Sequence, residues 1–363
     1  MTSSADLSSS VSIAEQAAGR RRPRNVPATG VLAPAARVPA KADWPGYLAA
    51  LVRRGALSVT FDPHALSLLS RASGRGRAYP HELIVALCLL QAATGYSMRR
   101  TLGLAADLAG LARRDVQLPS VATWCNRRRD LDVIAALDQL GRQIAVAAAT
   151  GPVVLLLDAT GVSLRRDGDW NRNKHARGRT DARKGRFVKL HAGVDEQTGC
   201  VLTAVVTGGD GKGSGDSSQG PVLTATAAQG TELAVVIGDG AYDTRACHTA
   251  ARQAGAKMVA PLAANAAYGL DPGRDIHLAQ IGRLGPPLWK RKVGYHRRSL
   301  VESTFGALKD TTGHTSRATS RAGATAEIHA RIALHNQWAA DVATSLQPVH
   351  PTWVARQQPG RIA

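Results

Sequence analysis

Apolar residues recur at two different spacings along the chain, and the change between them falls near Gly151. Between about residues 44 and 143 they recur every three or four residues, as in HELIVALCLLQAATG, and this spacing predicts amphipathic helices. After Gly151 the apolar runs are short and continuous, as in PVVLLLD and LAVVIGD, which is typical of strands buried on both faces of a sheet. The pattern predicts an all-helical segment followed by an α/β segment with a mixed sheet.

The second segment begins with three strand-like runs and then alternates helices with strands. A turn at EQTG is expected to join the second and third strands, and the helix TRACHTAARQAG is expected to begin at an N-cap, Asp243. Residues 262–294 are rich in Gly and Pro, and we expect them to be irregular. A helix at 296–309 and a long final helix at about 324–344 should follow.

The charge balance points to a polyanionic partner, because 46 Lys and Arg outnumber 27 Asp and Glu and give a net charge of +19. Nucleic acid is the usual partner of such a surface. The four cysteines lie far apart without a CxxC pair, which argues against a zinc module or a disulfide framework and for a reducing, cytoplasmic location. No apolar run reaches the roughly 18 residues of a membrane helix. Residues 1–40 are expected to be a disordered basic tail, and residues 345–363 a second tail.

One basic cluster lies in the helical segment, in the run LPSVATWCNRRRDL. Ser120 is a good N-cap, and Arg127, Arg128 and Arg129 crowd the C-terminal half of the helix that follows. A helix-turn-helix that reads a DNA groove would explain the arrangement. A capped surface helix with solvated arginines would explain it equally well.

Two further basic clusters lie in the α/β segment. Residues 165–189 hold ten cations and one tryptophan, a composition that suits phosphate contact and base stacking; the candidates for DNA binding are Trp170, Lys174, Arg177, Arg186 and Lys189. The run WKRKVGYHRR leads into the helix expected at 296–309, and it adds Lys290, Arg291 and Arg297 as candidates.

Two carboxylates end two of the predicted buried strands: Asp158 after PVVLLL, and Asp239 after LAVVIG. If the two strands are parallel neighbours, these side chains meet at one edge of the sheet, where α/β proteins place their sites. Two adjacent carboxylates repel each other unless a cation lies between them, and Mg²⁺ prefers such oxygen ligands. A single Asp at the end of a strand is commonly a turn residue, but a matched pair is harder to explain in that way.

A third carboxylate, Glu302, lies in the run YHRRSLVESTFGALK. Tyr295, Arg298, Glu302 and Lys309 are spaced three, four and seven residues apart, so they would share one face of a helix. An Arg298–Glu302 surface pair is the simplest interpretation, and it would stabilise the helix by a few tenths of a kcal/mol. A carboxylate surrounded by cations is better explained as a metal ligand whose neighbours bind phosphate.

With these residues the chain resembles bacterial insertion-sequence transposases of the DDE class, in the group with the signature Y-x2-R-x3-E-x6-K. Tyr295, Arg298, Glu302 and Lys309 keep every spacing of that signature. The run DATG is similar to the D-x-T-G motif at the first aspartate of the family, and GDGAYDTRA is similar to the segment with the second aspartate. The likeness extends from about residue 44 to residue 340.

The resemblance implies a ribonuclease-H-like catalytic domain at 151–344 with an insertion at 262–294, preceded by an all-α domain at 44–143 for DNA binding or dimerisation. It implies metal-dependent cleavage at insertion-sequence ends and strand transfer into target DNA. Asp158, Asp239 and Glu302 would be catalytic and would hold two Mg²⁺ ions, with Mn²⁺ as a substitute. Tyr295, Arg298 and Lys309 would hold the DNA end. The implied partners are the terminal inverted repeats, the target DNA and further copies of the chain, as a homodimer or larger assembly.

Three other functions compete with this interpretation. A tyrosine recombinase would need an HxxR motif, but the residue three places after His296 is Ser299. A metal-dependent nuclease, or a DNA-binding protein derived from a transposase, remains the alternative.

Overall fold

The computed structural model describes residues 79–164, 187–208 and 215–345, except 112, 114, 115 and 264, together with Ala49 and Val52. All of these residues belong to one compact unit of the chain. Outside them lie the expected N-terminal tail, residues 346–363 and most of the basic run at 165–189, including Trp170, Lys174, Arg177 and Arg186. None of the described helices has the length and apolar character needed to cross a bilayer.

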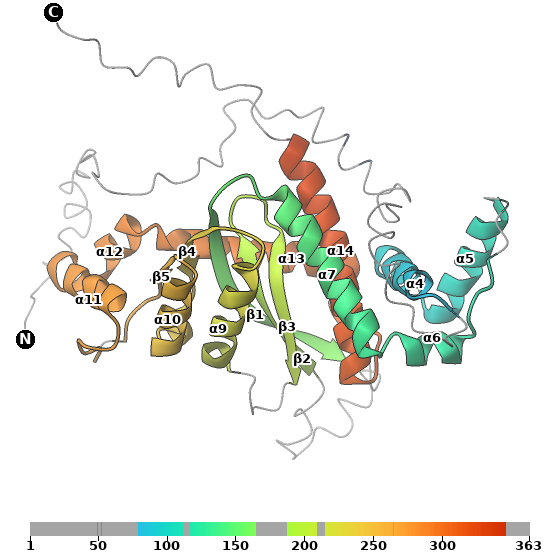
Figure 1. The fold of residues 1–363 in the computed structure, drawn as a ribbon, viewed down its shortest axis with the longest axis horizontal. Coiled ribbons are helices and arrows are strands. Elements are labelled where there is room, and N and C mark those ends of the chain that lie inside the picture. The colour runs from blue at the N-terminus through green and yellow to red at the C-terminus, as the bar shows by residue number, and fades with distance from the viewer. Residues whose placement is uncertain are drawn as a thin grey trace, which may run out of the picture. The chain divides into compact units, whose positions relative to one another are not determined.

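A mixed sheet lies at the centre of the described residues (Figure 1), as the sequence predicted. Its strands are β1 (Val153–Leu164), β2 (Phe187–Asp195), β3 (Val201–Gly208), β4 (Leu233–Ile237), β5 (Lys257–Val259) and β6 (Thr315–Ser316). The order is β3-β2-β1-β4-β5, with β6 pairing β1. The first three strands pair antiparallel, while β1–β4, β4–β5 and β1–β6 pair parallel. The run EQTG joins β2 to β3, as predicted.

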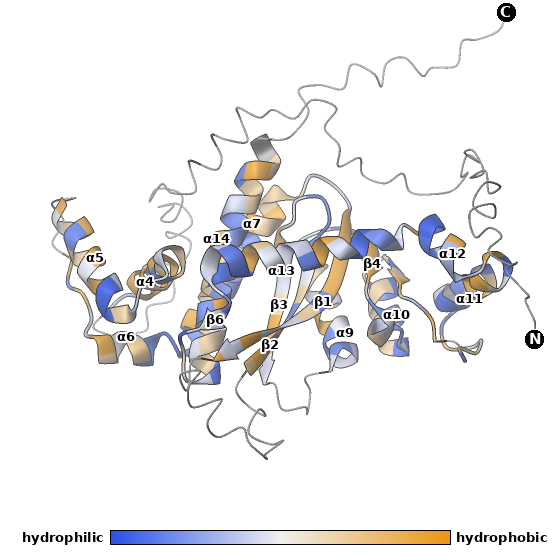
Figure 2. Cartoon of the chain, turned by 180° about the vertical axis from the view of Figure 1, so that it is seen from behind, coloured by the Kyte–Doolittle hydropathy of each residue, from blue (hydrophilic) through white to orange (hydrophobic). Residues whose placement is uncertain are grey.

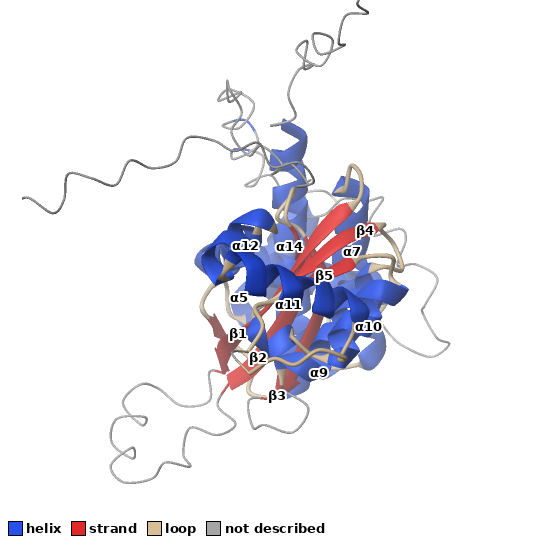
Figure 3. Cartoon of the chain, turned by 90° about the vertical axis from the view of Figure 1, so that its left-hand side faces the viewer, coloured by secondary structure: helices blue, strands red, loops and turns tan. Residues whose placement is uncertain are grey.

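Helices cover both faces of this sheet (Figure 3), because successive residues of the central strand β1 point to opposite sides. Leu155 and Leu157 pack with α9 (Asp216–Ala227), α10 (Arg245–Gln253) and the end of α7 (Leu131–Ala148). Leu156 and Val162 pack on the other side with α13 (Ser299–Thr312) and α14 (Arg321–Ser345). Continuous apolar runs were therefore a correct signal of strands buried on both faces (Figure 2).

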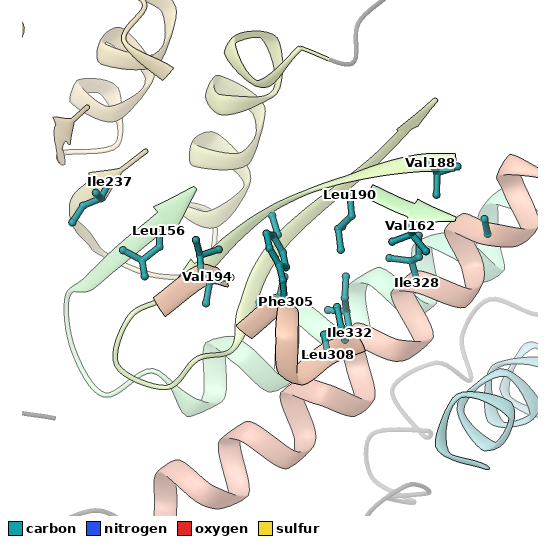
Figure 4. Close-up of a cluster of buried hydrophobic side chains, with 14 of the residues drawn as sticks. Leu156, Val162, Val188, Leu190, Val194, Ile237, Phe305, Leu308, Ile328 and Ile332 are labelled. Atoms are coloured by element: carbon teal, nitrogen blue, oxygen red, sulfur yellow. The ribbon is translucent and has the colours of Figure 1, made fainter. Parts of the chain in front are cut away.

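Helix α13 is fixed to the sheet by a narrow apolar stripe. Val301, Phe305 and Leu308 follow at four- and three-residue spacing, and each is at most 5% exposed. They belong to one buried apolar cluster with Leu190 and Ile328, and Figure 4 shows Phe305 and Leu308 in it. Burial of side chains of this size contributes roughly 1.5–3 kcal/mol each, so the stripe holds the opposite, polar face of α13 in a defined place over β1.

The N-terminal described residues are helical, as expected: α4 (His81–Thr94), α5 (Met98–Leu111), α6 (Val121–Arg127) and α7. Their core is shared with the last described helix, since Ile84 of α4, Trp124 of α6 and Leu137 of α7 pack with Ala330 and Leu334 of α14. Helix α14 thus contributes to this helical cluster and to the cluster under the sheet. The independence of residues 44–143 as a domain stays a prediction.

The expectation that residues 262–294 are irregular is wrong. Two helices, α11 (Pro272–Leu284) and α12 (Pro286–Lys292), occupy most of this segment. The Gly and Pro residues mark the ends of these helices: Pro272 follows the N-cap Asp271, and Gly285, at φ +74°, separates α11 from α12. The Asp271 side chain accepts from the backbone N–H groups of Gly273 and Arg274.

Two smaller predictions about where helices begin are also wrong. The N-cap of α10 is Thr244, whose hydroxyl accepts from the backbone N–H of Cys247, rather than Asp243. Residues 295–298 form a 3-10 turn, η3 (Tyr295–Arg298), so α13 begins only at Ser299. Tyr295 and Arg298 therefore precede the helix that carries Glu302 and Lys309.

Candidate active site

Asp158 and Asp239 lie level with each other where β4 ends. In the parallel pairing of β1 with β4, Leu156 is opposite Ile237, and each aspartate comes two residues later. The prediction that these strands are parallel neighbours is confirmed. The prediction that Asp158 ends its strand is wrong, because β2 continues to pair with β1 from Leu155 to Ser163. Asp158 therefore projects from the middle of a paired strand.

Asp158 projects from the same face of β1 as Leu156, which packs against α13. The side chain of Asp158 is 15% exposed. Burial raises the pKa of its carboxyl, the hydrogen bond from the Ala159 N–H and the charge of Arg298 lower it, and the charge of Asp239 raises it, with a net upward shift. The negative charge at Asp158 is thus held in a place that disfavours it, next to a second carboxylate.

A single guanidinium joins Asp158 to Glu302. Arg298 Nη2 lies 3.1 Å from Asp158 Oδ2, and Arg298 Nη1 donates to Glu302 Oε1 at 2.9 Å. The Arg298–Glu302 pair expected at the helix surface is therefore present, but the same arginine also reaches the strand. This second contact distinguishes the arrangement from an ordinary surface ion pair.

The turn after β4 fixes Asp239. The Asp239 carboxylate accepts from the Ala241 backbone N–H at 2.8 Å and caps the short 3-10 turn η2 (Gly240–Tyr242). A side chain at Gly238 would lie 2.7 Å from the buried Tyr242 ring, so only glycine fits there. Tyr242 packed against Gly238 thereby sets the direction in which the turn presents Asp239.

Tyr295 lies in η3, three residues before Arg298, and the charges of all three carboxylates act on it. Burial raises the pKa of its hydroxyl, the charge of Arg298 lowers it, and the charges of Asp239, Asp158 and Glu302 raise it further, with a net upward shift. The Lys290 ammonium lies 5.4 Å from the centre of the Tyr295 ring. The structure therefore gathers Asp158, Asp239, Glu302, Tyr295 and Arg298 from four separate elements.

The donor set of this site is made of carboxylate oxygens, which suit a hard divalent cation. Within the described part of the chain, no three His, Cys, Asp or Glu side chains are close enough together to hold a metal ion. The Glu302 side chain is 60% exposed and engaged by Arg298, whose guanidinium is the cation between Asp158 and Glu302. The guanidinium of Arg298 thus places a positive charge between these carboxylates. A divalent cation fits the same place once Arg298 turns to another anion.

Other predicted DNA-binding residues differ in what they contact. Lys290 and Arg291 are exposed at the end of α12, beside Lys292. Lys189 pairs with Asp216 at 2.9 Å. Arg297 is buried, unlike its neighbour Arg298: its Nη1 lies 3.2 Å from Glu196 Oε2, and its Nε donates to the Gly294 carbonyl.

The arginines at the end of α6 also contact groups of the protein itself. Arg127 donates to the Tyr79 carbonyl and pairs with Asp130. Arg128 is buried and donates to the side chain of Gln91, and Arg129 donates to the Cys125 sulfur. The predicted cap is present, since Ser120 Oγ accepts from the Thr123 N–H. The cap is therefore as predicted, but the arginines are not solvated, and the groove-reading role of this helix stays a prediction.

Glu196 and Thr160 were assigned no role from the sequence, although Thr160 is the threonine of the DATG run that resembles the D-x-T-G motif. Glu196 belongs to the turn EQTG and is only 5% exposed, and Thr160 accepts a 2.6 Å hydrogen bond from Lys309 Nζ. Thr160 carried a usable signal, because it follows Asp158 by two residues and so shares its face of the strand. No pattern in the sequence identified the partner of Glu196.

Replacement of Asp158 by Asn should raise the melting temperature at neutral pH. Because the pKa of Asp158 is raised in the fold, its ionised form is less favourable there than in the unfolded chain, and a neutral amide removes that cost. The gain should disappear as the pH falls below the unfolded pKa, where the carboxyl is protonated in both states. Thermal unfolding at several pH values measures this, with Asp310→Asn on the exposed face of α13 as the control. A lower melting temperature at neutral pH would contradict the expectation.

A family model described as Transposase DDE domain matches residues 149–337, just over half of the chain. A second family model with the same description matches residues 52–166. The first match contains Asp158, Asp239 and Glu302. No solved structure gives a significant match.

Proposed function

Because the chain belongs to the transposase DDE domain family, we propose that it cleaves DNA at the ends of an insertion sequence and joins the freed ends to target DNA. One observation carries the proposal: Asp158 and Asp239 lie level at the end of β4, and Arg298 links Asp158 to Glu302. The strand order β3-β2-β1-β4-β5, with antiparallel pairs on one side and parallel pairs on the other, supports a ribonuclease-H-like catalytic domain.

Asp158, Asp239 and Glu302 would hold two divalent cations, Mg²⁺ with Mn²⁺ as a substitute. When bound, such cations activate the attacking water or 3′-hydroxyl and stabilise the leaving oxygen. The carboxylates come from a paired strand, a capped turn and a helix fixed by its apolar stripe, so the fold sets their backbone positions. Glu302 would have to leave Arg298 to join the other two around a cation.

The cations of the protein would hold the DNA. Arg298 presents a planar fork of donors that matches a phosphate, and Lys309 and Lys290 add point charges on either side. A phosphate that competes for Arg298 would release Asp158 and Glu302 from the guanidinium. Double-stranded DNA, both transposon end and target, is the proposed partner, and two ends imply a homodimer or larger assembly.

The decisive experiment is an assay for joined products. The purified chain is incubated with Mg²⁺, a duplex carrying the DNA that flanks its gene, and a target plasmid. A transposase yields flanking DNA covalently joined to the plasmid, whereas a metal-dependent nuclease yields nicks alone. A DNA-binding protein derived from a transposase shifts the duplex without cutting it.

Neutralising Lys290, Arg291 and Lys292 together should weaken DNA binding and lower its salt dependence. These cations are exposed on α12, next to the turn that carries Tyr295 and Arg298. Each lost phosphate contact reduces the slope of log K against log salt by about 1, so the triple glutamine variant should lose about 3. Fluorescence anisotropy over a salt series measures the slope. Lys257→Gln, exposed at the opposite end of the parallel strands, serves as the control, and equal slopes in both variants would count against this surface.

A further inference from the structure

Thr160 and Lys309 join the catalytic strand to the catalytic helix. Lys309 Nζ donates to Thr160 Oγ1 at 2.6 Å, across 149 residues of sequence. Thr160 follows Asp158 by two residues on the same face of β1, and Lys309 follows Glu302 by seven residues on α13. The contact therefore ties α13 to β1 on the face of the strand that carries Asp158.

The surroundings of this contact are mostly apolar. A small pocket at this place is lined by Val162, Leu190, Leu308 and Ile328, besides Thr160 and Lys309, and its lining is completed by Thr312, Gly313 and Arg331. An ammonium next to such walls requires a polar partner. No carboxylate of the described residues lies within 4 Å of Lys309 Nζ, and the ammonium donates the hydrogen bond that holds it to the Thr160 hydroxyl oxygen.

A lysine held in this way keeps its capacity to bind phosphate. The ammonium has three donors, and Thr160 uses one of them, so two remain for phosphate oxygens. Threonine is β-branched and stiff about its first side-chain bond, whereas a free lysine side chain samples many rotamers. The pairing fixes a mobile charge to a rigid strand before DNA arrives.

We propose that Thr160 is a positioning residue that holds the Lys309 ammonium against β1, on the face of the strand that carries Asp158. The inference rests on the proposed function, and it assigns a task to a residue that is neither a metal ligand nor part of the cationic signature. Thr160 acts only through Lys309, so its hydroxyl matters and its size does not.

Thr160→Val and Thr160→Ser test the inference, because valine keeps the shape without the hydroxyl and serine keeps the hydroxyl. We expect Thr160→Val to lower kcat/KM for end cleavage about tenfold and Thr160→Ser to stay within about twofold of the wild type. Thr311→Val is the matched control, since that hydroxyl bonds only to carbonyls of its own helix. Melting temperatures verify folding, and Thr160→Ala replaces the valine variant if that variant is unstable.

A double-mutant cycle with Lys309→Gln separates positioning from a merely structural role. If Thr160 acts through Lys309, Thr160→Val should cost less than twofold in the Lys309→Gln background. Lys309→Gln should also reduce the salt slope of DNA binding by about 1, whereas Thr160→Val should leave it unchanged. An undiminished tenfold cost in the Lys309→Gln background, or valine and serine variants of equal activity, overturns the inference.

A measurement without DNA keeps this inference separate from the proposed function. The Lys309 ammonium protons, observed through their ¹⁵N signal and assigned with Lys309→Gln, should exchange slowly with water in the wild type and in Thr160→Ser. In Thr160→Val they should exchange rapidly. If the wild type fails to cleave DNA while this difference is present, the proposed function fails and the positioning contact stands. Equal exchange in all three proteins overturns the contact itself.

Discussion

Asp158→Asn is expected to abolish DNA cleavage while leaving binding of the transposon end intact. The reduction should be about 10³-fold or more, an increase in the barrier on the order of 4 kcal/mol. Asparagine has the same shape and still accepts a hydrogen bond from Arg298, so the fold and the cationic surface are preserved. What it loses is the negative charge placed level with Asp239. Cleavage of an end-labelled duplex and electrophoretic mobility shift measure the two properties separately.

Replacement of either of the other two carboxylates should also abolish cleavage, whereas replacement of a neighbouring carboxylate should not. Asp239→Asn and Glu302→Gln should lose cleavage to a similar degree, because each is proposed to hold the same pair of cations. Asp310→Asn should cleave as the wild type does, since Asp310 lies on the same helix but pairs with His314 at the surface. Full cleavage by Asp158→Asn, or equal losses in Glu302→Gln and Asp310→Asn, would refute the assignment.

Arg274→Met is expected to lower the free energy of unfolding by about 3–5 kcal/mol, the usual cost of removing one partner of a buried ion pair. The Arg274 and Asp243 side chains are each 6% exposed. Arg274 donates to both Asp243 oxygens, at 2.8 and 3.0 Å, and to the Ala267 carbonyl. Methionine fills similar space but leaves these acceptors without their donor. Urea unfolding measures the loss.

The exposed Arg283 on the same helix provides the control, and Arg283→Met should change stability by less than about 0.5 kcal/mol. Adding Asp243→Asn to Arg274→Met should recover part of the loss, because it removes a buried charge whose remaining partner is His248. A loss in Arg274→Met no larger than that in Arg283→Met would show that the pair does not stabilise the fold.

The stabilisation by this pair should depend on pH. Burial by itself raises the pKa of Asp243, but hydrogen bonds from His248 and Arg274, with their charges, outweigh burial and hold it below the ordinary value. A carboxyl with a lowered pKa stabilises the fold fully above its unfolded pKa and loses that contribution as the pH falls through its folded pKa. The difference between wild type and Arg274→Met should therefore shrink below about pH 4.

The three carboxylates could be predicted as site residues because simple sequence patterns surround them. Two apolar runs predicted strands buried on both faces, and the parallel order placed Asp158 near Asp239. The length of β1 could not be predicted from its apolar run, since residues beyond Asp158 are strand only through pairing with β2. Such pairing is a tertiary property that local composition does not record.

The prediction of a common helical face did not reveal that Arg297 and Arg298 have different surroundings. Adjacent positions in a basic run look alike in sequence, yet one guanidinium is buried against Glu196 and the other lies in the site. Both residues lie in a 3-10 turn that precedes α13, where successive side chains point in different directions. The Gly and Pro residues of 262–294 were misinterpreted for a related reason, since the same residues end helices and form irregular loops.

Folding of this molecule cannot be completed before helix α14 has been synthesised. It is the last described helix, and its residues complete both the apolar cluster around Trp124 and the cluster beneath α13. A chain emerging from the ribosome exposes both clusters until residues 321–345 have left the exit tunnel. The carboxylates on β1, after β4 and on α13 are synthesised earlier, but the surfaces that hold them together are not. Synthesis itself therefore delays the gathering of these carboxylates into one site until α14 has been made.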